Sequence, residues 1–280
     1  MRQPTRTLPT VATIRGVVVG VLLAAAAAVS AVAGATHAGF TTTTTTDGST
    51  ITAFTEGVPV TDGLVLELRA DDLTLADGEP VSLWPDTSGQ GNDATQPDTG
   101  RQPTYAATGM NGQPTLLFDG ASDYLDVADD PTLQLPDEFT IFAVVNLDAT
   151  TSGTDDIQTV LSKEASFSNR NYWLVQWDGD WAGRVSPNTP TVDGLAASTD
   201  PEVLSYRADG QLTLTTTGAT AAGDSYGTID TQAAPLRIGE QADDGDRHFT
   251  GAISAILLYD RALDDTERDD VTGHLADRWL

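Results

Sequence analysis

Cysteine is absent from this 280-residue sequence, and lysine and histidine are scarce. Without cysteine, no disulfide can crosslink the fold and no thiolate can act as a nucleophile or zinc ligand. The single lysine, Lys163, follows no phosphate-binding glycine loop, and the three histidines carry no local signature of a Ser-His-Asp triad. The sequence also has no Asn-x-Ser/Thr acceptor for N-glycosylation. Stability must therefore come from a large packed core, and thiol, zinc or phosphate-loop chemistry is not indicated.

Basic residues are also few compared with acidic residues. There are 14 basic residues against 41 acidic ones, of which 33 are Asp and 8 are Glu, so the net charge is −27. Such a surface repels nucleic acid and anionic lipid headgroups, and we expect no nucleic-acid partner. It also repels itself, and salt relieves this because the Debye length falls to about 3 Å at 1 M. The composition favours a halophilic protein, with an acidic surface protein adapted to ordinary salt as the alternative.

The longest apolar run, Val17–Ala35, follows Arg15-Gly16 near the N-terminus. It predicts a hydrophobic helix, and residues 1–38 are interpreted as a signal peptide or an N-terminal membrane anchor. Small residues suited to cleavage occur at 33–35 and at 36–38. A third interpretation rests on Arg15-Gly16-Val17-Val18, which resembles the processing site of archaeal pilin-like precursors. Under all three interpretations the rest of the chain is exported, so we expect an extracellular or cell-surface location.

Residues 39–61 form a threonine-rich spacer that contains the homopolymer Thr41–Thr46. This segment is too polar and too biased in composition to bury a core of its own. The folded domain is therefore expected over residues 62–280.

Apolar residues in that domain follow the two-residue period of β-strands. In the segment 139–147, Phe139, Ile141 and Val145 point one way and Phe142 the other, which predicts a strand buried on both faces. Asp-Gly pairs at 178–179 and 209–210 separate apolar runs and predict two hairpins. About ten to twelve strands with no long helix before residue 264 indicate an all-β antiparallel sandwich.

The last thirty residues predict a buried strand followed by a short C-terminal helix. The strand covers Phe249 to Asp260. Asp264 and Glu267 have the spacing of a capping box, and an apolar stripe follows at Val271, Leu275 and Trp279.

Two segments carry a family resemblance. The closing stretch Phe249-Thr250-Gly251-Ala252-Ile253 to Tyr259-Asp260-Arg261, and the loop Trp84-Pro85-Asp86-Thr87-Ser88-Gly89-Gln90-Gly91-Asn92-Asp93-Ala94, resemble laminin-G-like, concanavalin A-like jelly rolls. The resemblance frames Leu64 to Trp279 and implies the fold. It suggests carbohydrate at a cell surface or matrix as the partner, although one sandwich hosts many activities.

Glycosidases that share this resemblance carry two glutamates around an aspartate on one strand, so that both acids face the same bond. Here the two nearest glutamates, Glu56 and Glu67, are far too distant in sequence for that motif. We therefore expect no enzyme, and keep a glycoside hydrolase with an atypical acid pair as a remaining alternative.

Calcium is the cofactor that the acidic loops suggest, because it takes six to eight oxygen ligands. One candidate set is Asp86, Ser88 and Asn92, and a second is Asp119 with Asp123. A third set lies in the acidic stretch 243–246. In a chain this rich in aspartate, solvated loops are the competing interpretation.

Sugar binding is the remaining functional hypothesis. Aromatic rings pack on the apolar faces of sugars, and polar side chains bind the sugar hydroxyls. Trp177 and Trp181 flank the 178–179 turn, with Arg170, Asn171 and Asp178 close in sequence, and these five are the predicted ligand-binding residues. The alternative places Trp173 and Trp177 between the two sheets. Trp84 and Trp279 are expected in the core.

The sequence thus predicts an exported, non-catalytic, carbohydrate-binding or adhesive module, tethered to the membrane if the N-terminal helix is retained. The first alternative is a structural surface or pilin-like filament subunit with a jelly-roll head.

Overall fold

The computed structural model describes residues 43–46, 49–52, 57–153, 156–166, 169–187, 189–242 and 247–280. The chain divides into two units, Met1–Ala38 and Gly39–Leu280, and the expected N-terminal helix lies outside the described residues. Within the described part, no helix has the length and apolar character needed to cross a membrane. Two strands occur in the expected spacer, where β1 (Thr43–Thr46) and β2 (Ser49–Thr52) pair antiparallel. Threonine favours strands, which is consistent with a hairpin in so polar a segment.

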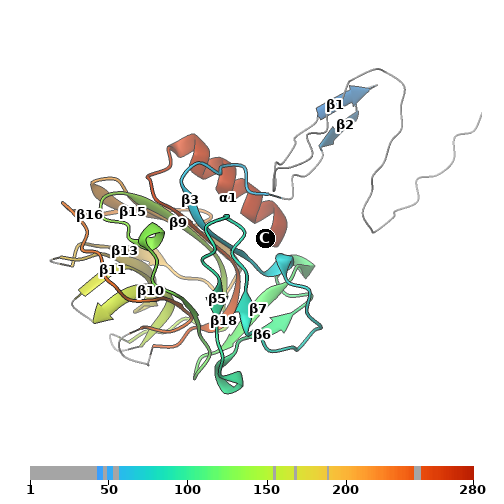
Figure 1. Cartoon of the computed structure of the whole chain (residues 1–280). Coiled ribbons are helices and arrows are strands. Elements are labelled where there is room, and N and C mark those ends of the chain that lie inside the picture. The colour runs from blue at the N-terminus through green and yellow to red at the C-terminus, as the bar shows by residue number, and fades with distance from the viewer. Residues whose placement is uncertain are drawn as a thin grey trace, which may run out of the picture. The chain divides into compact units, whose positions relative to one another are not determined.

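The rest of the described chain folds as an antiparallel β-sandwich of two sheets (Figure 1). The first sheet has eight strands, in the order β13 (Thr191–Ala196), β12 (Asp180–Arg184), β11 (Asn169–Trp177), β10 (Ile157–Ser166), β17 (Leu236–Ile238), β8 (Leu125–Val127), β5 (Ala94–Thr95) and β4 (Leu83–Trp84).

The second sheet runs in the order β16 (Thr220–Ser225), β15 (Gln211–Thr215), β14 (Glu202–Ala208), β9 (Phe139–Leu147), β18 (Thr250–Tyr259), β7 (Thr115–Asp119) and β6 (Thr104–Ala106). Strand β3 (Leu64–Arg69) pairs with the C-terminal half of β18, while β7 pairs with its N-terminal half. Strand β18 also pairs along its whole length with β9. It is therefore the central strand of the second sheet.

The main core lies between the sheets, and the alternation expected for β9 is confirmed. Phe139 and Ile141 belong to the inter-sheet core, whereas Phe142 and Val144 belong to a second cluster on the outer face of the second sheet. Phe139 packs against Tyr206 and Tyr172, with ring centroids 5.0 and 5.7 Å apart. Trp84 is buried in the inter-sheet core, as expected.

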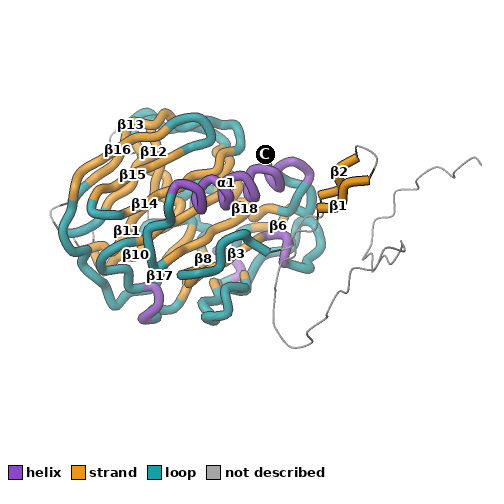
Figure 2. Tube along the Cα trace, turned by 90° about the horizontal axis from the view of Figure 1, so that it is seen from above, coloured by secondary structure: helices purple, strands orange, loops and turns teal. Residues whose placement is uncertain are grey.

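Helix α1 (Asp265–Trp279) lies against the outer face of the second sheet, close to β14 (Figure 2). The predicted capping box is confirmed, because the Asp264 side chain accepts the Glu267 backbone N–H and the Glu267 side chain accepts the Asp264 N–H. The predicted apolar stripe of Val271, Leu275 and Trp279 is fully buried. Figure 2 shows no corresponding helix over β10–β13 of the first sheet.

Both predicted hairpins are confirmed, but the expected number of strands was too low. From β3 onward the described residues form sixteen strands, of which five have only two or three residues: β4, β5, β6, β8 and β17. Such short strands span too few residues to show a two-residue period. Four single 3₁₀ turns, at Ala70–Asp72, Thr99–Arg101, Met110–Gly112 and Pro131–Leu133, complete the described connections.

Candidate functional site

The outer face of the first sheet carries a small apolar cluster of its own. Strands β11 and β12 pair so that Trp173, Val175 and Trp177 lie opposite Arg184, Ala182 and Asp180. The side chains of Trp173, Val175, Ala182 and Ile157 form a cluster separate from the inter-sheet core, and Trp177 packs against it. Strand β11 is therefore apolar on both faces, although no helix of the described residues covers its outer face.

Arginine side chains stack on the two tryptophans of this face. The Arg170 guanidinium lies 4.6 Å from the centre of the Trp173 ring. The Arg184 guanidinium lies 4.0 Å from the Trp177 ring centre and 5.8 Å from that of Trp173. Cation–π contacts of this kind hold the planes of ring and guanidinium together. We call Arg170, Trp173, Arg184 and Trp177 the Trp–Arg ladder.

The ladder has a closed end and an open end. At the closed end, Trp173 and Arg170 are fully buried, and Arg170 pairs with the equally buried Glu164 at 3.2 Å. At the open end, Trp177 and Arg184 are only half-buried. A solvent-borne ligand can therefore reach the ladder at Trp177 and Arg184, while the buried Arg170–Glu164 pair anchors the other end.

Arg184 occupies an unusual electrostatic environment. Burial lowers the pKa of its guanidinium from the ordinary value, and the charges of Arg170 and Arg247 lower that pKa further, against an opposing effect of Asp193. Arg247 reaches this region because its backbone carbonyl accepts the N–H of Thr159 on β10. Three arginines thus gather around one end of a sheet in a strongly acidic chain.

The structure separates the five predicted ligand-binding residues into two groups. Trp177 lies at the open end of the ladder, Arg170 lies at its closed end, and Asp178 is exposed in the β11–β12 turn with φ of +51°. Trp181 and Asn171 are not surface residues. Both are fully buried, so neither of these two predicted ligand-binding residues is exposed to a ligand from solvent.

Hydrogen bonds to partners distant in sequence account for the burial of these two side chains. The Trp181 indole N–H donates to Glu202 on β14 at 2.7 Å. The Asn171 amide donates to the Leu135 carbonyl and accepts the Leu135 N–H. The alternative that placed Trp173 and Trp177 between the sheets is also wrong: these two share a face, as alternation requires, but it is the outer face.

The sequence reasoning missed Arg184, although the signal was present. A two-residue Asp-Gly turn fixes the register of the strands it joins. Counting outward from Asp178-Gly179 pairs Trp177 with Asp180 and Trp173 with Arg184, as observed.

The loop around Asp86 does not fit the predicted calcium site. The Asp86 carboxylate accepts the backbone N–H groups of Glu67, Ser88 and Asn92 and the Ser88 hydroxyl, at 2.8–2.9 Å. The Asn92 amide nitrogen donates to the Val65 carbonyl at 2.8 Å. Donors point at this carboxylate from several directions, whereas a calcium ion needs oxygen atoms facing it. Asp86 acts as the hydrogen-bond centre of the loop.

The second predicted set is arranged in a similar way. Asp119 accepts the backbone N–H groups of Ala121, Ser122 and Asp123, and Asp123 accepts the N–H of Asp119. Burial acts to raise the pKa of Asp119, but these hydrogen bonds outweigh it and lower that pKa below the ordinary value. Burial and the charge of Asp119 raise the pKa of Asp123 to about 6. This turn also does not fit calcium.

No group of three or more acidic or histidine side chains placed to hold a metal ion occurs among the described residues. The third predicted set, Asp243, Asp244 and Asp246, lies outside them. Calcium binding there stays a prediction.

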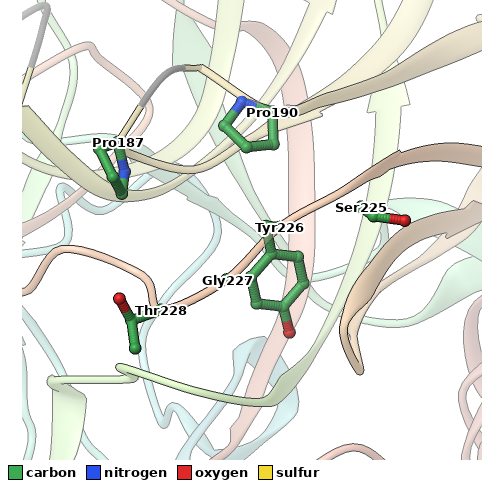
Figure 3. Close-up of a pocket in the computed structure, with 6 residues that line it drawn as sticks. All are labelled: Pro187, Pro190, Ser225, Tyr226, Gly227 and Thr228. Carbon is green, nitrogen blue, oxygen red and sulfur yellow. The ribbon is translucent and has the colours of Figure 1, made fainter.

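A separate hollow of about 350 Å³ lies between the β12–β13 loop and the segment after β16. It is lined by Pro187, Pro190, Ser225, Tyr226, Gly227 and Thr228 (Figure 3). The Tyr226 hydroxyl donates to the Asp137 carbonyl at 2.6 Å and accepts the Gly210 N–H at 3.0 Å. Both hydrogen bonds fix the ring, and Figure 3 shows the hydroxyl directed away from the two prolines. The hollow therefore has an aromatic wall but no free phenol.

Two antiparallel sheets, a core between them and polar loops at their ends define a lectin-type sandwich. The chain belongs to the Laminin_G_3 family of the concanavalin A-like lectin/glucanases superfamily, because the family model matches residues 119–267, more than half of the sequence. No curated protein matches the sequence.

Solved structures share the fold at low identity. The ligand-binding domain of botulinum neurotoxin serotype D, in complex with N-acetylneuraminic acid, is 11% identical, with a TM-score of 0.57 over 76% of this chain and 51% of that one. The Trypanosoma rangeli sialidase in complex with sialic acid is 18% identical, with a TM-score of 0.54 over 85% of this chain and 36% of that one.

A third similar structure is domain 4 of an extracellular arabinanase from Geobacillus stearothermophilus, in complex with arabinotriose. It is 17% identical, with a TM-score of 0.52 over 75% of this chain and 98% of that one. The chain spans about half the length of the toxin binding domains that it matches. At these identities the likeness shows the fold alone.

Proposed function

We propose that the protein is an exported, non-catalytic carbohydrate-binding module whose ligand contacts the open end of the Trp–Arg ladder. One observation carries the proposal: the indole ring of Trp177 is held half-exposed on a sheet face by the stacked guanidinium of Arg184. A ring fixed in this way offers apolar area to a sugar without a large loss of side-chain entropy on binding.

Polar groups beside Trp177 complete the chemistry that a sugar requires. Asp180 lies directly opposite Trp177 across the hairpin and is half-buried, and Asp178 is exposed in the turn. Carboxylates accept hydrogen bonds from sugar hydroxyls, while the ring packs on the apolar face of the sugar. A cell-surface or matrix glycan is therefore the proposed partner.

The similar structures support a carbohydrate ligand but include enzymes. Two of them, the toxin domain and the arabinanase domain, were solved with N-acetylneuraminic acid and arabinotriose. A glycosidase needs a general acid with a raised pKa beside a second carboxylate. Glu67, Asp123 and Glu202 are carboxyl groups with a raised pKa, and all three lie outside β10, β11 and β12. The position of these three acids favours binding over hydrolysis at the ladder.

Export is part of the proposal and rests on the sequence of residues 1–38. The N-terminal sequence of the mature protein distinguishes the interpretations. Secretion predicts a start near Thr36 or Gly39, pilin-like processing predicts a start at Val17, and a retained anchor leaves the N-terminus intact.

The binding site is tested on a glycan array at about 1 M salt, where long-range charge repulsion is screened. We expect Trp177→Ala to reduce the affinity for the selected glycan by tenfold or more, roughly the contribution of a stacked ring. Tyr226→Ala is the matched control, because Tyr226 is also half-buried but lines the separate hollow. Loss of binding in Tyr226→Ala alone would move the site to that hollow. Absence of any bound glycan would favour the structural-subunit alternative, and release of reducing sugar would favour a hydrolase.

A further inference from the structure

Arg184 stands apart from the other basic side chains of the described residues. Nine of these, Arg69, Arg101, Lys163, Arg170, Arg207, Arg237, Arg261, Arg268 and Arg278, form ion pairs with acidic side chains. Arg184 forms no ion pair and no side-chain hydrogen bond with any described residue, and its contacts are the two tryptophan rings. In a chain with 41 acidic and 14 basic residues, a guanidinium without a carboxylate partner is unexpected.

Arg184 is charged because a guanidinium is not deprotonated in proteins, and it is accessible to a ligand. Arg170 and Arg247 act on it with charge of the same sign, and its side chain is half-buried at the open end of the ladder. Its Nε atom is enclosed without an acceptor, so an incoming anion meets the terminal nitrogens of the guanidinium. Contact with the Trp177 ring at 4.0 Å restrains the guanidinium that carries these nitrogens. A fixed planar fork matches the two oxygens of a carboxylate.

We propose that Arg184 binds the carboxylate of an acidic sugar, so that the glycan recognised at the Trp–Arg ladder carries a uronic- or sialic-type residue. This inference rests on the proposed function and names its ligand class. In it, Trp177 packs against the sugar ring and Arg184 forms a bidentate ion pair with the carboxylate. The unpaired guanidinium thus acquires from the ligand the partner that the protein does not supply.

The net charge of the protein opposes any anion at long range, and this sets the conditions of the test. At about 1 M salt the Debye length is about 3 Å, so distant acidic residues are screened while a partly buried contact pair is screened less. Selectivity for an acidic sugar is therefore expected to appear most clearly at high salt.

The experiment measures the affinity of the full-length protein for two matched pairs of ligands by calorimetry at about 1 M salt. One pair is trigalacturonate and its methyl ester, in which methylation removes the charge of the carboxyl groups, and the other is 3′-sialyllactose and lactose. We expect the acidic member of at least one pair to bind about tenfold more tightly, as one charge-assisted bidentate contact provides.

Variants assign that preference to a residue. Arg184→Gln should abolish the preference, and the affinity for the neutral member should fall by a smaller factor because Trp177 loses its stacking partner. Arg184→Lys should retain a small part of the preference because the charge remains but the planar fork is lost. Trp177→Ala should weaken both members of a pair equally. Circular dichroism and melting curves of each variant establish whether it is folded. If Arg184→Gln does not fold, Arg184→Lys still tests the assignment to Arg184.

Failure of this inference differs from failure of the proposed function. Equal affinity for charged and neutral members, or binding of neutral glycans alone, overturns the acidic-sugar inference and leaves carbohydrate binding in place. A preference for the acid that persists in Arg184→Gln overturns the assignment to Arg184. No binding of any glycan overturns both.

Discussion

Each of the two sheets has apolar side chains on its outer face, and the two faces are covered in different ways. On the second sheet, Phe142 and Val144 of β9 and Leu257 and Tyr259 of β18 are covered by helix α1. On the first sheet, the apolar outer face of β11 is covered by stacked arginine side chains. A helix seals a face completely, whereas stacked side chains leave an edge that is half-exposed. The comparison teaches that the face without a helix is the one that leaves aromatic and cationic side chains within reach of solvent.

The largest expected effect comes from removing the seal of the second sheet. Trp279 is fully buried, and its indole N–H donates to the Pro114 carbonyl at 3.1 Å. Trp279→Ala should lower the free energy of unfolding by about 4 kcal/mol, because it leaves a cavity and removes that hydrogen bond. The neighbouring Leu280 is 39% exposed, and Leu280→Ala should cost less than about 0.5 kcal/mol. Urea unfolding in high salt measures both, and equal costs would mean that α1 does not seal this face.

The two ends of the ladder provide the next test. Arg170→Gln should cost about 3 kcal/mol, because it removes the guanidinium that pairs with the buried Glu164. Arg184→Gln should cost about 1 kcal/mol or less, because only cation–π contacts at a half-exposed site are lost. Thermal melting compares the two variants. A cost at Arg184 as large as that at Arg170 would make the ladder a purely structural cover.

A pH experiment examines the turn that carries the chain from the second sheet to the first. The pKa of Asp123 is about 6 in the folded protein against an ordinary value of 3.8, so the folded state holds this proton more tightly than the unfolded chain does. Its contribution to stability is therefore undiminished below about pH 4, falls between about pH 4 and 6, and stays low above that range. Asp123→Asn should gain in stability relative to the wild type as the pH rises through this window, as measured by urea unfolding.

Asp119→Asn is the control for that experiment and should behave in the opposite way. The pKa of Asp119 is lowered in the folded protein, so its carboxylate contributes stability above its unfolded pKa and loses it as the pH falls. The cost of Asp119→Asn should therefore be greater at neutral pH than in acid. The same pH trend in both variants would show that the two carboxyl groups do not differ as described.

The smallest expected effect lies at the start of the covering helix. Asp264→Ala removes the side-chain acceptor of the capping box and should cost about 1 kcal/mol. Asp269→Ala, at an exposed helical position, should cost about 0.5 kcal/mol or less. Differential scanning calorimetry resolves the pair, and indistinguishable melting temperatures would argue against a structural role for the cap.

The sequence allowed the fold to be predicted more fully than the site. Local sequence patterns predicted local structure correctly. The strand 139–147 that is buried on both faces, the Asp-Gly turns and the capping box at Asp264 all appear as expected. Alternation also placed Trp173 and Trp177 on one face, but a period of two cannot say which face is inside. That choice depends on partners distant in sequence, such as Glu202 for Trp181 and Leu135 for Asn171.

The acidic loops show the same limit in another form. Aspartates close in sequence suggested ion binding, yet at Asp86 and Asp119 the nearest partners are backbone N–H groups of their own turns. The sequence gives the number of carboxylate oxygens in a loop, but it does not show which hydrogen-bond donors face them. Similarly, nothing local distinguished Arg184 from other arginines until the pairing of β11 with β12 placed it across from Trp173.

The position of β18 has a consequence for biosynthesis. Strands β3, β7 and β9 all pair with it, although it follows every other described strand in the sequence. A nascent chain that has not yet emerged as far as Tyr259 leaves all three without their common neighbour. The second sheet can therefore close only after the chain has left the ribosome as far as Tyr259, so β3, β7 and β9 must wait for a partner that is distant in sequence.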